Sequence, residues 1–243
     1  MNFQFLSEHI NEIGEQMAKC TRNCDGIRNE PSKGIIPRGL ILEAGDQSDM
    51  GFIVMGINPG TFENSIDEKE ILSKKGIRAN YDTLKEVWEK ATMRRPYYSK
   101  IRKFIRNIKI DGINSQCPIL WTDIVKCESI TESTIKNGKL VQKILPIQNE
   151  TKCTCASLFL ENELNNPLIK DWPIFAIGRD AFEALNGMLP EKTLMGIFHT
   201  SYGHLEKWVK EDKNNIESKM NELLVHSVKS HVWLPRNREE WGK

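Results

Sequence analysis

Long apolar runs are missing from this sequence of 243 residues. No stretch approaches the ~20 apolar residues that a membrane-spanning helix requires. The first twelve residues, MNFQFLSEHINE, are too acidic and too poor in apolar residues for a secretory signal. These absences predict a cytoplasmic protein that does not enter a membrane.

A surplus of charge of either sign is also missing. The chain has 34 basic and 33 acidic side chains and a net charge of +1. Contact with nucleic acid would therefore depend on local basic patches and not on an overall field. Candidate patches are Arg94-Arg95, residues 100–106 and residues 236–238, which can equally be solvated helix faces.

Repeats and low-complexity segments are absent as well, and the length suits one substantial core. We expect a single domain over residues 1–243, with an N-terminal helix and a cysteine pair as an extension over about residues 1–45. The six cysteines of a protein in a reduced compartment are not expected to form disulfides. They are core residues, metal ligands or cluster ligands.

The stretch from residue 51 to residue 60, GFIVMGINPG, is the best candidate for a site-bearing strand. The apolar run FIVM stops at Gly56, and the loop sequence Ile-Asn-Pro-Gly follows, which is typical of a buried parallel strand ending in a tight loop. In an open α/β sheet the ligand crevice lies beyond the carboxyl ends of the strands. Asn58 is therefore a candidate site residue, and an asparagine chosen for its turn propensity is the alternative.

Strand-like and helix-like patterns alternate along the rest of the chain. Further strands are predicted at residues 117–127, 173–177 and 194–198, with a short one at 39–43. Amphipathic helices are predicted over residues 5–17, 68–75, 81–91, 101–108, 155–164, 179–185 and 205–228, the last as one helix or two, and residues 129–150 as a loop or excursion. This order predicts an α/β fold with a short central parallel sheet and helices on both faces.

Several motifs resemble those of the uracil-DNA glycosylase superfamily. Gly56-Ile-Asn-Pro-Gly60 is similar to the loop of the mismatch-specific branch, and the segment from His199 to His204, HTSYGH, stands where the family has its histidine loop. Between about residues 13 and 208 the order of motifs is similar to that of the iron–sulfur, thermophile-type branch. The matching segments are Cys20 with Cys24, Pro96-Tyr97, Thr122-Asp-Ile-Val-Lys-Cys127, Cys153 or Cys155, and residues 174–181. The resemblance implies a uracil-DNA glycosylase-like fold.

The resemblance implies hydrolysis of the bond between a flipped-out pyrimidine and its deoxyribose, without a catalytic metal. Asn58 would hold the attacking water through its amide oxygen, and it would position this water more than deprotonate it, because an amide is a poor base. His199 would donate a hydrogen bond to the pyrimidine O2, where negative charge gathers. The iron–sulfur branch usually has an acid in place of Asn58, so this chain departs from that branch.

Residues that would contact the base follow from the same resemblance. Gly56 and Ile57 would border the base, and Tyr97 would stack on it where the family has a phenylalanine. Tyr98 is the second choice for the stacked ring. Ordinary packing of these rings onto the core is the alternative.

Residues that would contact DNA come mainly from the histidine loop. Thr200 stands where the family usually has a proline, so the assignment of a phosphate contact to Ser201 is less direct. His204 is either a second candidate histidine or a surface residue of the next helix, and we favour the surface. The residues assigned to DNA are Ser201, Tyr202, Gly203 and Lys126.

Asp123 replaces an asparagine that, in the family, faces the Watson–Crick edge of the base. An acid within a strand is costly unless it is paired or near solvent. An ionised carboxylate only accepts hydrogen bonds, so it would repel uracil O4 and accept from the cytosine amino group. Removal of plain cytosine would destroy the genome of the cell. Asp123 therefore favours a cytosine with a bulky 5-substituent, as in phage DNA, with residues 63–78 and 129–150 available to hold it.

Four cysteines fit the ligand set of a [4Fe–4S] cluster in the related branch. They are Cys20, Cys24, Cys127 and Cys155, with Cys153 as the alternative to the last. Three residues separate the first pair where the family usually has two, so zinc, or no metal at all, stays open. A cluster would have a structural role and tie the N-terminal helix to the sheet.

The sequence thus predicts a monomeric, monofunctional DNA glycosylase that acts on a modified cytosine in anti-phage defence. Uracil or mismatch repair is the alternative, if Asp123 is protonated or displaced. A catalytically silent nucleic-acid-binding module on the same fold is the second alternative. A metal-binding regulator would explain the cysteines and leave the loop after Gly56 unexplained.

Overall fold

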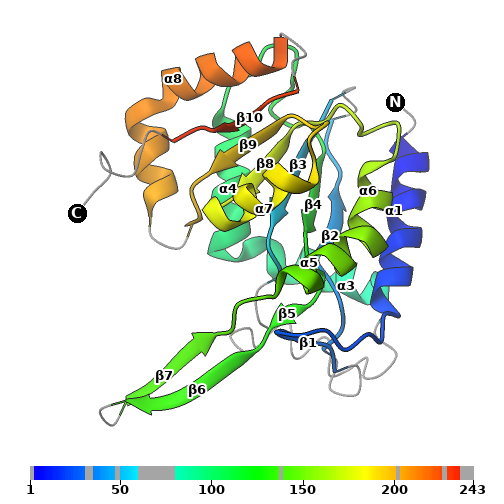
Figure 1. Cartoon of the computed structure of the whole chain (residues 1–243). Coiled ribbons are helices and arrows are strands. Elements are labelled where there is room, and N and C mark those ends of the chain that lie inside the picture. The colour runs from blue at the N-terminus through cyan, green and yellow to red at the C-terminus, as the bar shows by residue number, and fades with distance from the viewer. Residues whose placement is uncertain are drawn as a thin grey trace.

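A six-stranded sheet forms the centre of the computed structural model, which describes residues 3–30, 35–46, 50–59, 80–136, 139–200, 203–225 and 229–235. The strand order is β10-β9-β8-β3-β4-β2 (Figure 1). The strands are β2 (Leu40–Glu43), β3 (Phe52–Gly56), β4 (Ile119–Asp123), β8 (Ile174–Ile177), β9 (Leu194–Ile197) and β10 (His231–Trp233). All neighbours pair in parallel except β2, which runs antiparallel to β4 at one edge.

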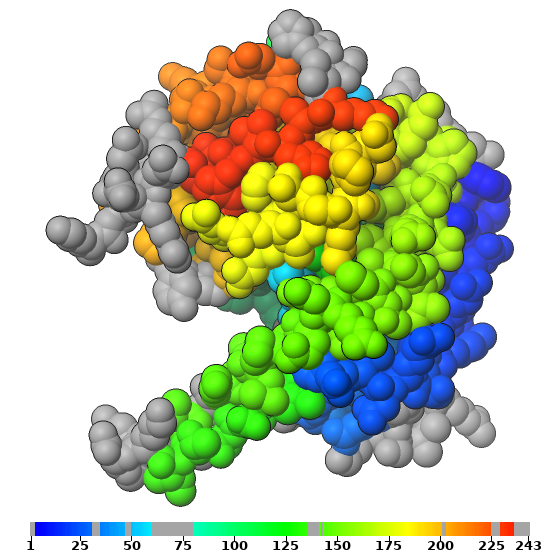
Figure 2. Space-filling model, in the orientation of Figure 1, coloured from blue at the N-terminus to red at the C-terminus, as the bar shows by residue number. Residues whose placement is uncertain are grey.

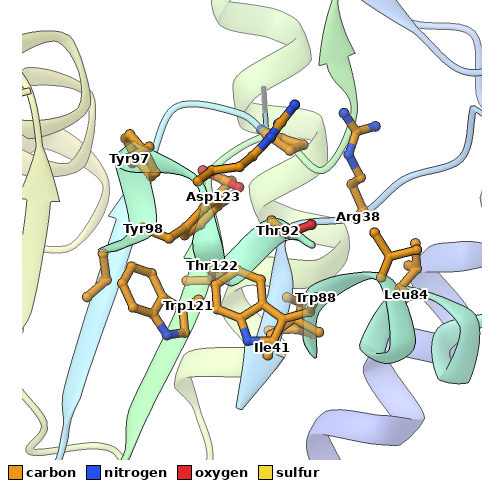
Figure 3. Close-up of a pocket in the computed structure, with 16 residues that line it drawn as sticks. Arg38, Ile41, Leu84, Trp88, Thr92, Tyr97, Tyr98, Trp121, Thr122 and Asp123 are labelled. Atoms are coloured by element: carbon orange, nitrogen blue, oxygen red, sulfur yellow. The ribbon is translucent and has the colours of Figure 1, made fainter. Parts of the chain in front are cut away.

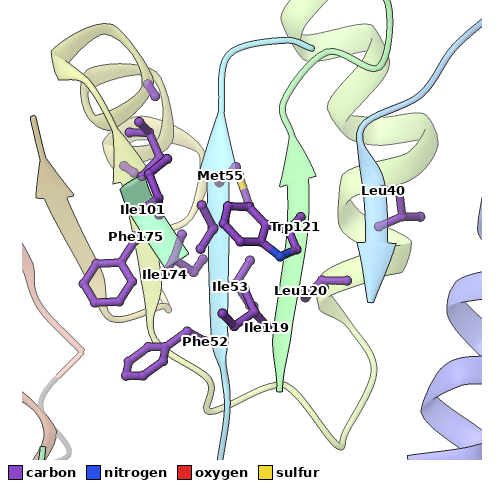
Figure 4. Packing of buried hydrophobic residues seen from close by; sticks show 14 of the residues in the cluster. Leu40, Phe52, Ile53, Met55, Ile101, Ile119, Leu120, Trp121, Ile174 and Phe175 are labelled. Atoms are coloured by element: carbon purple, nitrogen blue, oxygen red, sulfur yellow. The ribbon is translucent and has the colours of Figure 1, made fainter. Parts of the chain in front are cut away.

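The four middle strands carry the core. Every residue of β3, β4, β8 and β9 is buried, as expected for parallel strands that are covered on both faces. Figure 4 shows these side chains lined up along β3 and β4. The rings of Phe52 and Phe175, from strands paired in the sheet, lie 5.0 Å apart between centroids.

Helices flank the sheet, with α7 in front of it and α4 behind it in the view of Figure 1. The helices are α1 (Phe3–Ala18), α3 (Tyr81–Lys90), α4 (Pro96–Asn107), α5 (Asn149–Cys155), α6 (Glu161–Leu164), α7 (Arg179–Met188) and α8 (His204–Val225). A 3-10 turn, Thr92–Arg94, precedes α4, and a π-helical turn, Ala156–Leu160, joins α5 to α6. Within the described ranges, no helix is long and apolar enough to cross a membrane.

The path of the chain through the sheet creates a point where ligands usually bind. From β3 the chain proceeds to β4 on one side, and it then crosses over to β8 on the other side of β3. In an open α/β sheet such a change of direction is a topological switch point, and ligands bind there beyond the carboxyl ends of the strands. Gly56, Asp123, Ile177 and Ile197 end the parallel strands at this edge.

The prediction of an α/β fold with a mostly parallel, helix-flanked sheet is confirmed. The strands predicted near residues 52, 119, 174 and 194 are present, although the second ends early, at Asp123. The edge strand β2 is antiparallel, which the prediction of a parallel sheet did not include. The helix predicted at 68–75 lies outside the described residues. The helix predicted at 155–164 begins earlier, at Asn149.

Residues 129–150, which the sequence pattern assigned to an excursion or a loop, contain two strands that were not predicted. Residues 131–144 form an antiparallel hairpin of β6 (Thr131–Lys136) and β7 (Lys139–Ile144). It stands away from the body of the protein (Figures 1 and 2). A signal was available, since an Asn-Gly pair between two alternating segments is the strongest short-range mark of a hairpin.

A further small sheet anchors this hairpin. β5 (Glu128–Ser129) pairs antiparallel with β1 (Ile27–Arg28), so the segment that follows β4 is tied to the N-terminal part of the chain. The backbone N–H of Leu145 donates to the carbonyl of Ile130 at 2.9 Å. This bond continues the β6–β7 hydrogen-bond ladder by one pair beyond Thr131 and Ile144.

Candidate functional site

The loops that follow β3 and β4 are fastened to each other. Gly56 and Asp123 are register partners at the ends of these strands. The backbone N–H groups of Ile124 and Val125 donate to the carbonyls of Gly56 and Ile57, at 3.1 and 2.8 Å. The predicted base-binding residues of the two motifs therefore form one rigid unit at the carboxyl edge of the sheet.

The carboxyl group of Asp123 lies between two glycines, Gly39 and Gly56. A Cβ atom added at Gly39 would clash with Oδ2 of Asp123, and one added at Gly56 would lie 2.5 Å from Oδ1. Gly39 also has a φ of +93°, which favours glycine. Only residues without a side chain therefore leave room for the Asp123 carboxyl group at this place.

Burial raises the pKa of Asp123 to about 8. The positive charges of Lys126 and Arg38 and the N–H of Gly56 act in the opposite direction, but they do not outweigh the loss of solvation. Only 7% of the residue is exposed. At neutral pH the carboxyl group is mainly protonated, so it can donate one hydrogen bond as well as accept.

Tyr97 connects the end of β3 with the loop that follows β9. It lies in the first turn of α4, where Pro96 occupies the favoured first helical position. Its ring lies 5.4 Å from the ring of His199, and its hydroxyl would be 3.1 Å from a Cβ at Gly56. Burial, and next the charge of Asp123, raise the pKa of Tyr97 well above the usual value.

His199 lies two residues beyond the end of β9. Burial lowers the pKa of its imidazole, and the charge of Asp180 opposes the shift. The ring is therefore neutral at pH 7 and offers one N–H donor and one acceptor. Gly178 precedes α7 with a φ of +87°, which favours glycine, and it lies in ordinary contact with the side chain of His199.

Asn58 holds the matching position two residues beyond the end of β3. Its amide nitrogen donates to the hydroxyl of Ser129 at 3.0 Å and to the carbonyl of Pro59 at 3.1 Å. These two contacts use the amide nitrogen, so the amide oxygen of Asn58 remains available to other hydrogen-bond partners. Because β8 separates β3 from β9, Asn58 and His199 follow strands that are roughly 10 Å apart, a separation that suits a base held between them.

A pocket opens beside Asp123, and the space between its lining residues, with the adjoining open solvent included, is about 640 Å³ (Figure 3). Aromatic rings form one wall, with Tyr98 packed edge-on against Trp88 at 4.6 Å and against Trp121 at 5.4 Å. Tyr98 therefore belongs to this wall, whereas Tyr97 contacts His199. The polar and charged lining residues are Arg38, Thr92, Arg95, Thr122 and Asp123.

Sequence reasoning missed most of this lining. Arg38 arrives from the segment before the antiparallel edge strand β2, and Trp88 from α3, so only the folded chain brings them beside Asp123. Asn58 and His199 are not among the lining residues, although Pro59 and Tyr97 next to them are. The pocket is thus an extension of the site on the far side of Asp123.

The four predicted cluster ligands do come together. Cys20, Cys24, Cys127 and Cys155 line one mainly apolar pocket with about 330 Å³ of space. Cys153 is exposed and is not part of this lining. The alternative assignment of the fourth ligand to Cys153 therefore has no geometric support.

The surroundings of three of these thiols, Cys24, Cys127 and Cys155, raise their pKa and so oppose ionisation. Burial, then the charges of Cys155 and Cys20, raise the pKa of Cys127, and burial also raises the pKa of Cys24. The backbone N–H of Lys126 donates to Sγ of Cys155 at 3.3 Å, a contact that suits a metal-bound thiolate. In the described part of the chain, no group of three or more His, Cys, Asp or Glu is arranged to hold a single metal ion. Four thiols around one pocket are a donor set that either zinc or an iron–sulfur cluster takes.

Lys126 cannot contact DNA as predicted. Its side chain is fully buried, and Nζ donates to Oγ1 of Thr122 at 2.6 Å, to the Asp123 carbonyl at 2.7 Å and to Oε2 of Glu163 at 2.9 Å. The prediction was wrong because the basic charge is turned inward, toward an equally buried acid on α6. Lys126 instead braces the segment that carries Asp123.

The remaining predicted DNA contacts are only partly described. Ser201 and Tyr202 lie outside the described residues, as do residues 236–238. Gly203 has a φ of +71° and directly precedes α8. His204 begins α8, the next helix, and is half-buried, with its ring 5.8 Å from that of Phe198.

Comparison with known proteins does not place the chain in a family. No family model matches the chain, and no curated protein matches it. The resemblance to the uracil-DNA glycosylase superfamily therefore rests on the motifs and on where their residues lie in the fold. Chemically, the arrangement offers an amide to hold a water, a neutral imidazole to donate a hydrogen bond, a ring to stack and a carboxyl group to read a polar edge.

Proposed function

We propose that the protein is a monofunctional DNA glycosylase that hydrolyses the N-glycosidic bond of a flipped-out pyrimidine and leaves an abasic site. The observation that carries the proposal is that Asn58, Asp123 and His199 all lie at the carboxyl edge of the sheet, around its topological switch point. Tyr97 supports it, because its ring meets His199 and its hydroxyl lies near Gly56. Aromatic faces beside hydrogen-bonding groups are how proteins hold extruded bases.

Each residue has a separate task in the reaction. The amide oxygen of Asn58 accepts a hydrogen bond from a water and holds it toward C1′ of the nucleotide. The water oxygen bonds to C1′, and the bond from C1′ to the base nitrogen breaks with its electron pair left on the base. The proton that the water loses passes through solvent to the base, which leaves as a neutral molecule. Neutral His199 donates to O2 of the departing base, where the charge develops. Base and sugar then leave without a covalent enzyme intermediate.

Among the described residues, no lysine lines the pocket beside Asp123. Strand cleavage by a bifunctional glycosylase needs a lysine that attacks the sugar. Lys126, the lysine nearest to Asp123 along the chain, is fully buried and donates to Glu163. We therefore expect an abasic product in an uncut strand.

A cytosine with a bulky 5-substituent is the substrate that we propose, in a role in defence against phage with modified DNA. Asp123 accepts from the cytosine amino group in either protonation state. The pocket beside Asp123, lined by Trp88, Tyr98 and Trp121, is the place that we propose for the substituent. Residues 129–150 stay a second candidate for holding the substituent, and residues 63–78, the other predicted segment, lie outside the described residues.

Uracil is the second candidate, and one observation favours it. The pKa of Asp123 is raised to about 8, so at neutral pH the carboxyl group can donate to uracil O4 and accept from N3–H, as an asparagine would. The repulsion that would exclude uracil then applies only above that pH. Uracil repair thus becomes chemically compatible with this site.

A [4Fe–4S] cluster is the cofactor that we propose, held by Cys20, Cys24, Cys127 and Cys155. Bound iron would remove the protons from the four thiols and link the segment after α1 to the segment that follows Asp123. Its contribution would be structural, because it would hold the base-reading strand in place. The protein would act on DNA as a monomer.

The deciding experiment measures base release from matched duplexes that contain uracil, cytosine, 5-hydroxymethylcytosine or its glucosylated form. Abasic sites are detected by cleavage in alkali, and untreated samples show whether the enzyme itself cuts the strand. Release of a modified cytosine alone supports defence, and release of uracil alone supports repair. Binding of all four duplexes without release of any base would mean a catalytically silent nucleic-acid-binding module.

A further inference from the structure

The β6–β7 hairpin is an arm that begins at the candidate site. β4 ends at Asp123, and the chain reaches β6 at Thr131 through β5. Asn58 donates to Ser129 at the root of this arm, at 3.0 Å. Figure 2 shows the arm standing away from the body, with an open recess between them. The arm therefore projects from the same edge that would receive a nucleotide.

The root of the arm is held firmly. Glu128 is buried and forms ion pairs with Arg38 at 2.8 Å and with Arg28 at 3.3 Å. The backbone N–H of Ile130 donates to the carbonyl of Gly26 at 3.1 Å. The direction of the arm relative to the site is thus set by several contacts and not by one flexible linker.

The two faces of the arm differ in character. Thr131 pairs with Ile144, and residues four apart on a strand share a face, so Ile135 and Ile144 lie on one face. Their side chains are 76% and 65% exposed. Glu132 pairs with Lys143 on the opposite face. A two-stranded ribbon that leaves apolar side chains in water is marginal alone and gains stability from a partner.

The charge of the arm indicates what that partner is. Residues 131–144 contain three lysines, Lys136, Lys139 and Lys143, and one acid, Glu132. Lys136 and Lys139 are register partners at the end of the arm nearest the turn. The whole chain carries a net charge of only +1, so this excess is local. A basic ribbon suits an anionic partner, and the major groove of DNA is wide enough for two strands.

We propose that the β6–β7 hairpin lies in a groove of duplex DNA beside the extruded nucleotide, with its lysines on phosphates and its isoleucines against sugars and base edges. The proposal deepens the proposed function and rests on DNA as the partner, but it concerns affinity and not chemistry. The two can therefore fail independently.

The experiment measures the affinity of an unmodified duplex as a function of salt concentration. In the variant, Lys136, Lys139 and Lys143 are all replaced by alanine. The matched control replaces three exposed lysines from elsewhere, Lys170, Lys210 and Lys229, so that the net charge is the same. Loss of three phosphate contacts should flatten the slope of log K against log salt by ~2.7, whereas the control should keep the wild-type slope.

A second variant, Ile135→Ser with Ile144→Ser, separates the apolar face from the charges. It should weaken DNA binding several-fold without a change in the salt slope. Equal affinity and slope in the triple-alanine variant and its control would overturn the proposal. So would a wild-type dimer in light scattering that becomes a monomer in the double-serine variant, because a second copy would then cover the arm. DNA binding that depends on the lysines, without release of any base, would contradict the proposed glycosylase activity and leave the proposed role of the hairpin intact.

Discussion

The amide nitrogen of Asn58 lies 3.0 Å from the hydroxyl oxygen of Ser129 and donates a hydrogen bond to it. The same nitrogen donates to the carbonyl of Pro59 at 3.1 Å, and because a carbonyl only accepts, the two contacts together fix which end of the amide is the oxygen and hence where a water can be held. The partner comes from the segment after β4, 71 positions along the chain. The position of the proposed water thus depends on the docking of two loops.

Replacement of Asn58 by alanine should lower the rate of base release at saturating DNA by about 10²- to 10³-fold, the usual cost of one positioned polar group in a transition state. Affinity for the duplex should stay nearly unchanged, because the side chain acts on the water and not on DNA. Single-turnover rates and equilibrium binding, measured side by side, check this. A parallel loss of both quantities would remove Asn58 from the mechanism.

Replacement of Ser129 by alanine should lower the rate by about fivefold, since a hydrogen bond that orients the amide contributes about 1 kcal/mol. The same change in the Asn58→Ala background should have no further effect, because the amide that Ser129 orients is then absent. A double-mutant cycle on the single-turnover rate tests this. Additive losses would show that Ser129 acts elsewhere.

The pH dependence of uracil release should report the ionisation of Asp123. Below its pKa of about 8 the carboxyl group donates to O4, and above that pH it only accepts. Release of uracil should therefore fall as the pH rises through about 8, whereas release of a cytosine derivative should not fall with it. Rates at pH 6 to 9 on both substrates measure the difference.

The control for this pH dependence is Asp123→Asn, which keeps a donor at every pH. Its rate on uracil should be flat where that of the wild type falls, and its rate on cytosine derivatives should decrease. A wild-type profile without a step near pH 8 would show that Asp123 does not face O4.

Substitution of single cysteines should show, through colour and iron content, which of them are cluster ligands and which are not. Protein purified without oxygen is expected to be brown and to contain iron and sulfide. Cys127→Ser should abolish colour and iron, because this buried residue lines the pocket with the other three thiols. Cys153→Ser should retain both, since Cys153 is exposed and outside that lining. Stoichiometric zinc, or colourless wild-type protein without metal, would contradict the cluster.

Lys126 and Glu163 should behave as a buried ion pair. Lys126→Met leaves a buried carboxylate without its partner, so the free energy of unfolding should fall by about 3–5 kcal/mol. Combination with Glu163→Leu should recover most of the loss, because the unpaired charge is then removed as well. Urea unfolding of the single and double variants provides the measurement. A double variant no more stable than Lys126→Met would refute the pairing.

The sequence alone determined the class of the fold and the order of its site motifs. Short apolar runs that end in Gly or in a polar residue identify buried parallel strands, and the helical periods between them require helices on both sides. The role of His199 was implied by the resemblance of its loop to the histidine loop of the family, whereas Asn58 could be predicted because it closely follows such a run. Local pattern carries this information, since strand ends and loop residues are neighbours in the chain.

Only the tertiary structure decided the environment of these residues. Nothing in the sequence shows that Gly39 and Gly56 enclose Asp123, that its pKa rises to about 8, or that Lys126 turns inward to Glu163. These facts depend on contacts between segments that are distant in the chain, and solvation and charge act through space. The meaning of Asp123 for substrate choice is therefore a property of the fold, because burial decides whether that carboxyl group carries a proton.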